Sequence, residues 1–167
     1  MIYHSTRNSQ LRADSAAAVL EGLAPDGGLY VPQQLPEFDW KACLQGSAMD
    51  MANAILSALL PDIPNMDQLV SKAYTGKFAT EELTPTVPVG NFGILELFHG
   101  PTSAFKDVAL CMLPQLLTAA RKVKSPEDSI LILTATSGDT GKAALEGFKD
   151  VEGIKAVLVA AVLGIHV

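Results

Sequence analysis

The residues that decide the fold are Ile130-Leu131-Ile132-Leu133-Thr134-Ala135-Thr136-Ser137-Gly138-Asp139-Thr140-Gly141-Lys142. The first six form a near-continuous apolar run, which is typical of a strand buried on both faces of a parallel sheet. The pattern that follows predicts a helix over 140–148 and a second apolar strand over 156–162. A strand, a crossover helix and another strand in this order predict an α/β fold with a parallel sheet.

An earlier strand-to-helix junction carries Lys106. The sequence predicts a strand over 94–98 and a helix over 107–124, in which Pro114 should produce a kink or a split. A lysine at such a junction is a candidate Schiff-base nucleophile, and this chemistry needs a neutral amine, which desolvation by neighbours such as Phe98 and Phe105 would favour. The alternative is a solvated lysine at a helix start.

The first part of the chain has a different pattern. Apolar residues at helical spacing predict helices over 15–23, 50–60 and 67–74, and a brief strand-like segment covers 29–31. The prolines within 84–89 exclude a helix interior. We therefore expect a small helical unit over 1–82 and an α/β unit over 83–167.

The composition restricts the class of protein. Of the 167 residues, 49% are hydrophobic and 18% charged, and the net charge is −6. This balance is globular and gives no basic footprint for nucleic acid or an anionic membrane. The N-terminus does not read as a secretory signal, and no apolar run is long enough to span a bilayer. The two cysteines, Cys43 and Cys111, lie far apart, so we expect small core residues and a cytoplasmic protein.

The turn Thr136-Ser137-Gly138-Asp139-Thr140-Gly141 has the form of an anion-binding site at a helix start, where a carboxylate or phosphate could bind. The charge of Asp139 would repel an anion unless it faces another group. The alternative is helix capping by Ser137, Asp139 or Thr140. A nucleotide-binding P-loop is excluded, because Thr136 and Ala143 occupy positions that require glycine and Ser or Thr.

Two smaller features remain open at this point. The segment Gly90-Asn91-Phe92-Gly93 precedes a strand, so we expect a hairpin turn with Asn-Phe at its tip instead of a phosphate loop. His99 could act as an acid or base, or could be a packed histidine beside a Gly-Pro turn.

Four segments together resemble, in order, the N-terminal part of the threonine synthase family. They are Ser5-Thr6-Arg7, Gly22-Leu23-Ala24-Pro25-Asp26-Gly27-Gly28-Leu29-Tyr30-Val31-Pro32, Leu95-Glu96-Leu97-Phe98-His99-Gly100-Pro101-Thr102-Ser103-Ala104-Phe105-Lys106-Asp107, and Ile132-Leu133-Thr134-Ala135-Thr136-Ser137-Gly138-Asp139-Thr140-Gly141-Lys142-Ala143-Ala144. The resemblance runs from about Tyr3 to Val159.

The resemblance implies a tryptophan-synthase-β-like enzyme that uses pyridoxal 5′-phosphate (PLP). Lys106 would form the Schiff base with PLP and later move protons between substrate carbons. The implied reaction converts O-phospho-L-homoserine and water to L-threonine and phosphate. The residues Thr136 to Gly141 would hold the substrate carboxylate, Asp139 would also border the cofactor ring, and Thr102 and Phe105 would flank the cofactor.

After Val159 the sequence departs from the family pattern. Residues 160–167 diverge, and the family's loop for the PLP phosphate would lie beyond them. We therefore expect an N-terminal fragment with part of the active site, whose exposed sheet edge promotes self-association. The alternatives are a non-catalytic fragment or interaction module, and a threonine-synthase-like phospholyase that releases a keto acid.

Overall fold

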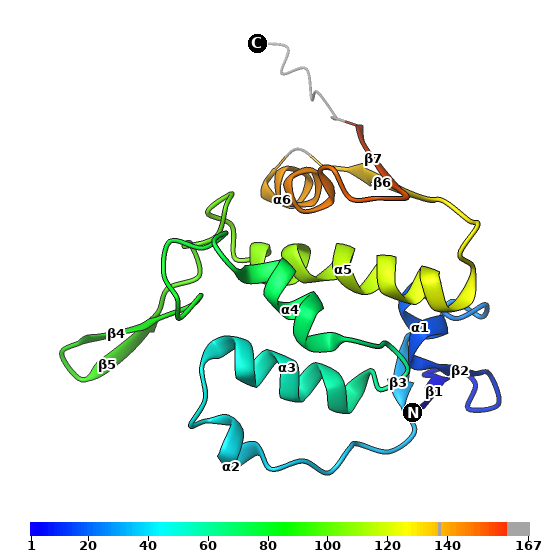
Figure 1. The fold of residues 1–167 in the computed structure, drawn as a ribbon, viewed down its shortest axis with the longest axis horizontal. Helices are drawn as coiled ribbons and strands as arrows, with labels where there is room; N and C mark the ends of the chain where they lie inside the picture. Colours follow the sequence, from blue (N-terminus) through cyan, green and yellow to red (C-terminus); the bar gives the residue numbers. More distant parts are fainter. Residues whose placement is uncertain (137, 160–167) are drawn as a thin grey trace. The chain divides into compact units, whose positions relative to one another are not determined.

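The computed structural model describes residues 1–136 and 138–159. Its contacts divide the chain into two compact units, of which the first contains Met1–Lys72 and Gln115–Asp128. The second contains Ala73–Pro114 and the described residues from Ser129 onward. Figure 1 follows the elements along the chain.

A three-stranded antiparallel sheet begins the first unit. Its strands are β1 (Ile2–Ser5), β2 (Arg12–Asp14) and β3 (Tyr30–Pro32), in the order β2-β1-β3. The side chain of Tyr3 is buried, and its hydroxyl donates a hydrogen bond to the backbone carbonyl of Leu59, at 2.6 Å. The sequence analysis found only the β3 region, so the N-terminal part of the fold is less purely helical than we expected.

The helices of this part of the chain follow the predicted positions. They are α1 (Ser15–Glu21), α2 (Trp40–Cys43), α3 (Ala48–Leu59) and α4 (Met66–Tyr74), and only the short α2 was not predicted. Local capping fixes their ends: the Asp14 carboxylate accepts from the backbone of Ala17 at the start of α1, and Ser47 and Asp50 form a capping box on α3.

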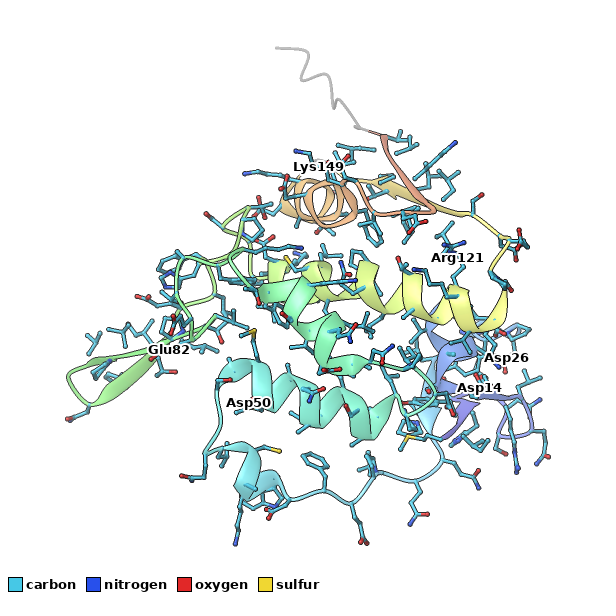
Figure 2. All side chains as sticks on the ribbon, in the orientation of Figure 1. Asp14, Asp26, Asp50, Glu82, Arg121 and Lys149 are labelled. Atoms are coloured by element: carbon cyan, nitrogen blue, oxygen red, sulfur yellow. The ribbon has the colours of Figure 1, made fainter. Side chains whose placement is uncertain are left out.

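Two polar residues hold separate segments of the first unit together. The carboxylate of Asp62 accepts hydrogen bonds from the backbone and hydroxyl of Ser15 and from the amino group of Met1, at 2.6 to 3.2 Å. The buried guanidinium of Arg121, labelled in Figure 2, donates to the carbonyls of Pro126 and Asp128, each at 2.8 Å. These contacts tie the chain's start and the end of α5 to neighbouring loops.

An antiparallel hairpin, β4 (Thr86–Val89) and β5 (Phe92–Leu95), belongs to the second unit. Val89 pairs with Phe92, so the two-residue turn is Gly90-Asn91, and Gly90 has φ 59°. A positive φ at the first turn position suits glycine and a type II′ turn. The predicted hairpin is confirmed, but its predicted Asn-Phe tip is wrong by one residue because Gly90 supplies the left-handed conformation.

The helix α5 (Asp107–Lys124) has the predicted bounds and contains Pro114 without a split. Pro114 has no N–H to donate to the carbonyl of Leu110, one turn earlier. The backbone of Gly147 approaches this carbonyl so closely that a Cβ on Gly147 would lie 2.1 Å from the Leu110 oxygen. Glycine therefore permits close packing between α6 and the first half of α5.

The strand–helix–strand unit is present as predicted. It consists of β6 (Ile130–Ala135), α6 (Asp139–Phe148) and β7 (Ile154–Val159), with β6 and β7 parallel. The predicted residues 160–162 of the last strand lie outside the described residues. The sheet confirms the mixed α/β class.

The prediction that β6 is buried on both faces is wrong for the described structure. Leu131 and Leu133 on one face are 63% and 67% exposed. The helix α6 covers the opposite face, where a Cβ on Gly141 would lie 2.8 Å from a side-chain methyl of Leu158. A single helix can cover only one face of a sheet, and no described element covers the other.

Candidate functional site

Lys106 is the last residue before α5 and is half-buried. Its amino group lies 4.2 Å from the centroid of the Phe105 ring, and among the described residues it has no hydrogen bond or ion pair. The rings of Phe98 and Phe105 are 54% and 61% exposed, so the predicted enclosure of the lysine is only partial. The amine is therefore accessible for chemistry.

Asp107 fixes the loop that carries Lys106. Its buried carboxylate accepts from the backbone N–H of Thr102 at 2.8 Å and from the Thr102 hydroxyl at 2.6 Å. Both groups of Thr102 are also buried. We call this pair of hydrogen bonds the Asp107 clamp. It closes residues 102–107 into a compact loop with Lys106 next to its anchor.

The clamp also explains Gly100 in this loop. A Cβ at Gly100 would lie 2.5 Å from the Cβ and from a carboxylate oxygen of Asp107. Any side chain there would displace the carboxylate from Thr102. Nearby, Ser103 has φ 60°, a conformation that non-glycine residues seldom adopt. Such strain is held in place only where surrounding contacts determine the backbone.

Two further side chains hold this region. The hydroxyl of Tyr74 donates to the carbonyl of Val108 at 2.9 Å, and burial raises the pKa of Tyr74 to about 12, so it stays a donor at neutral pH. His99 contacts the carboxylate of Glu96 at 2.7 Å and stacks on Phe98 with ring centroids 4.6 Å apart. The structure thus gives His99 a carboxylate partner and a packed ring.

The second predicted segment forms the turn between β6 and α6. Gly138 is the residue that caps the start of α6, has no side chain to offer, and donates its N–H to the Thr136 hydroxyl at 3.1 Å. Neither Asp139 nor Thr140 caps the helix; both are exposed in its first turn. Ser137 lies outside the described residues. In the described part, the start of α6 has no side-chain cap.

Gly141 serves packing in this turn. A Cβ on Gly141 would lie 2.3 Å from the methyl group of Thr136 and 2.8 Å from Leu158. By contrast, a Cβ on Gly138 would meet nothing within 4 Å. Gly141 thus allows α6 to approach the sheet, and Gly138 faces open space.

Both predicted segments belong to the second unit, where α6 packs on α5 at Gly147 and Leu110. Among the described residues, no hydrogen bond or ion pair joins Lys106 to Thr136 or to 138–141. Sequence reasoning missed the role of Asp107 in positioning Lys106. The available signal was a threonine five residues before an aspartate in the first turn of a helix.

The described residues contain no group of three or more His, Cys, Asp or Glu placed to hold a metal ion. In the same part of the chain, no helix has both the length and the apolar character needed to cross a membrane.

Known proteins resemble this chain in sequence and in fold. The family model described as threonine synthase N terminus matches residues 2–74. A threonine synthase from Methylobacillus glycogenes is 37% identical over 172 residues, covering 95% of this chain and 36% of that protein. The human protein named threonine synthase-like 1 is 39% identical over 140 residues, covering 78% of this chain and 18% of that protein.

A solved structure agrees with these matches. The crystal structure of PLP-bound threonine synthase from Brucella melitensis superposes with a TM-score of 0.87 at 36% identity. The match covers 96% of this chain and 35% of that structure, so the chain spans about a third of the length of the threonine synthases that it matches. The sequence matches and the α/β fold agree, and the chain belongs to the threonine synthase family.

Proposed function

We propose that this chain supplies the lysine-bearing part of a PLP-dependent active site that converts O-phospho-L-homoserine and water to L-threonine and phosphate. The observation that carries the proposal is the amine of Lys106, which has no hydrogen bond or ion pair among the described residues and stands next to the buried Asp107 clamp. Family membership connects this arrangement to threonine biosynthesis.

The residues present fit PLP on two observations of this structure. An aldehyde cofactor needs an accessible amine to attach to, and Lys106 provides one. An anionic group needs backbone donors, and the start of α6, without a side-chain cap in the described part, provides them. When bound, PLP supplies an electron sink for chemistry at the substrate's α- and β-carbons.

In this proposal each residue has a stated task. The Nζ of Lys106 holds the cofactor and moves a proton between substrate carbons. The Asp107 clamp would hold the backbone that carries Lys106, and Phe105 would flank the cofactor. Thr102 would also flank the cofactor, while its hydroxyl and backbone N–H both donate to Asp107.

The start of α6 binds the substrate. We propose that its backbone donors, with the hydroxyls of Thr136, Ser137 and Thr140 and the close approach allowed by Gly138 and Gly141, hold the substrate carboxylate. Asp139 borders the cofactor ring. A cytoplasmic location is part of the same proposal and is based on two cysteines that form no disulfide.

Product analysis tests the proposed reaction. The chain is incubated with PLP and O-phospho-L-homoserine, and L-threonine and phosphate are measured together, with Lys106→Ala as the comparison. Equal amounts of both products, lost in Lys106→Ala, support threonine synthase activity. Phosphate with a keto acid in place of threonine would assign a phospholyase instead, and the absence of any product would leave the chain as a non-catalytic module.

A further inference from the structure

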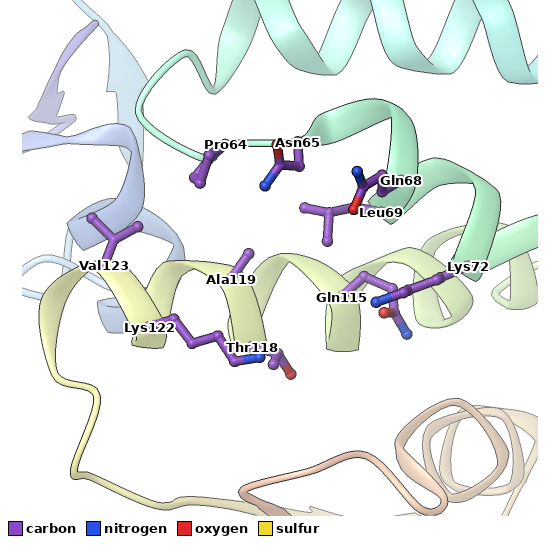
Figure 3. A pocket seen from close by; sticks show the side chains of 10 residues that line it. All are labelled: Pro64, Asn65, Gln68, Leu69, Lys72, Gln115, Thr118, Ala119, Lys122 and Val123. Carbon is purple, nitrogen blue, oxygen red and sulfur yellow. The ribbon is translucent and has the colours of Figure 1, made fainter.

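A cavity of about 420 Å³ lies within the first unit, between α4 and the second half of α5 (Figure 3). The polar residues from α5 have the spacing i, i+3, i+7, and the two from α4 have the spacing i, i+4, so each set lies on one helical face, while Asn65 directly precedes α4. These residues are Asn65, Gln68 and Lys72 from the α4 side, and Gln115, Thr118 and Lys122 from α5. The cavity is thus lined by two matching polar stripes.

The charge of this lining is positive. Lys72 and Lys122 line the cavity, and no aspartate or glutamate does. Neither lysine has a hydrogen bond or ion pair with any described residue, whereas Lys124 on the same helix pairs with Asp14. Figure 3 shows Lys122 extending along α5 toward Thr118 and Lys72 reaching over Gln115. In a chain of net charge −6, two cations share this cavity without a counter-charge.

The hydroxyl of Thr118 adds a second observation. Its oxygen is buried and has no hydrogen-bond partner. A buried hydroxyl without a partner costs about 1 to 3 kcal/mol, so most such groups are hydrogen-bonded in native proteins. Thr118 lines the cavity, and a change of its side-chain rotamer on binding would turn this hydroxyl toward a ligand that could accept its proton.

We propose that this cavity binds a small organic phosphate monoester. Two ammonium groups match the charge of a phosphate dianion, and lysine binds phosphate as a point charge. The amides of Gln68 and Gln115 can donate to and accept from polar groups on the organic part, and Leu69 offers apolar surface to its carbons. Lys106 does not line this cavity, so the site is additional to the proposed reaction.

Calorimetric titration of the chain with glycerol 3-phosphate tests this proposal. We expect saturable binding that weakens about tenfold in Lys72→Gln and in Lys122→Gln, since each removes a charge-assisted contact. Both lysines are exposed, so these variants should fold. Lys149→Gln is the matched control, because it removes the same charge from an exposed lysine that does not line the cavity and should leave binding unchanged.

Thr118→Val separates a binding role from a structural one. Valine has nearly the same shape and removes the unpartnered hydroxyl, so thermal stability should stay the same or rise. If the hydroxyl donates to the phosphate, glycerol 3-phosphate should nevertheless bind several-fold more weakly. Unchanged affinity in Thr118→Val would contradict its place in the site.

Other outcomes would overturn the proposal as a whole. The absence of saturable heat with glycerol 3-phosphate would exclude a built site. A loss of affinity in Lys149→Gln as large as that in Lys72→Gln would exclude it as well. Inorganic phosphate binding as tightly as the ester would show that the amide and apolar surfaces recognise nothing, and would reduce the site to an adventitious ion only.

Discussion

A single buried carboxylate, Asp107, fixes the loop that carries the lysine on which the proposed chemistry depends. Residues in contact with it include Thr102, which donates two hydrogen bonds, and Gly100, whose lack of a side chain leaves room for the carboxylate. Because Lys106 directly precedes Asp107, any loss of this anchor moves the amine as well. Stability and site geometry are therefore coupled at one residue.

Asp107→Ala should lower the free energy of unfolding by about 3 kcal/mol, because it leaves a buried N–H and hydroxyl of Thr102 without an acceptor. Urea denaturation measures the change. Glu152→Ala, which removes an exposed carboxylate, should shift stability by no more than about 0.5 kcal/mol. An Asp107→Ala protein with the wild-type midpoint would show that the clamp does not stabilise the loop.

The sequence pointed to Lys106, the residue proposed to carry the chemistry, and missed Asp107, which fixes the loop beside it. Lys106 stood out because an unusual residue type lies between two apolar elements. The hydrogen bonds from Thr102 to Asp107 close a loop over five residues. Neither helical nor strand periodicity in the sequence predicts such a closure. The predicted desolvation of Lys106 by Phe98 and Phe105 was only partly met, since both rings are more than half exposed and ring orientation depends on packing partners remote in sequence.

At the level of elements, the contact between α5 and α6 depends on a proline and a glycine acting together. Pro114 leaves the Leu110 carbonyl without its helical donor, and Gly147 brings the backbone of α6 against that carbonyl. A larger residue at Gly147 cannot be accommodated by side-chain rotation, because the atom that it would meet belongs to the backbone.

Gly147→Ala should therefore destabilise the chain by about 2 kcal/mol, since the cost of overpacking exceeds the gain of about 1 kcal/mol from alanine's helix propensity. Thermal unfolding followed by circular dichroism measures the effect. Gly138→Ala is the control for the added methyl group, because a Cβ there meets nothing within 4 Å, and only the poorer N-cap preference of alanine should lower stability, by less than about 1 kcal/mol. Equal stability of Gly147→Ala and wild type would refute the close packing.

The junction of the N-terminus, α1 and the loop before α4 depends on one ionised carboxylate. Hydrogen bonds from Ser15, followed by the amino group of Met1, hold the pKa of Asp62 below its ordinary value of 3.8. A carboxylate whose pKa is lower in the folded than in the unfolded state contributes its full stabilisation at a pH above its unfolded-state pKa. This contribution is lost as the pH falls through its folded-state pKa.

Stability should consequently fall as the pH drops below about 4, and Asp62→Asn should flatten this acid dependence while lowering stability at neutral pH. Urea unfolding at a series of pH values measures both. Glu81→Gln, at an exposed position without a hydrogen bond or ion pair among the described residues, should leave the acid slope as it is. If stability fell equally steeply with pH in the wild type and in Asp62→Asn, this carboxylate would be excluded as a source of the acid dependence.

The elements differ in how well periodicity predicted them. The bounds of α5 and β6 were predicted as observed, because long apolar patterns and flanking turn residues define them. The strands β1 and β2 were missed, since they have four and three residues and β1 is held between β2 and the distant β3. Short strands of this kind depend on tertiary contacts that the local sequence does not specify.

Taken as a whole, the described molecule leaves much apolar surface uncovered. One face of the β6–β7 sheet exposes Leu131 and Leu133, and the β4–β5 hairpin exposes Phe92 and Ile94. Large exposed apolar patches favour association with other protein surfaces. The sequence predicted an exposed sheet edge but not the exposed sheet face. A run of apolar residues in a strand does not show which face of the sheet a helix will cover.

The chain should therefore self-associate as its concentration rises, and Leu133→Lys should reduce the association by placing a charge on the bare face. Sedimentation velocity over a range of concentrations measures it, with far-UV circular dichroism to confirm that the variant keeps its fold. A monodisperse monomer at high concentration would contradict this expectation.

The most direct test of the whole account is to locate the amine that captures the cofactor. The chain is incubated with PLP, treated with borohydride and digested, and the modified lysine is identified by mass spectrometry. The account predicts one stable adduct at Lys106, retained in Lys142→Ala and absent in Lys106→Ala. Labelling that persists in Lys106→Ala, or that maps to another lysine in the wild-type chain, would contradict it.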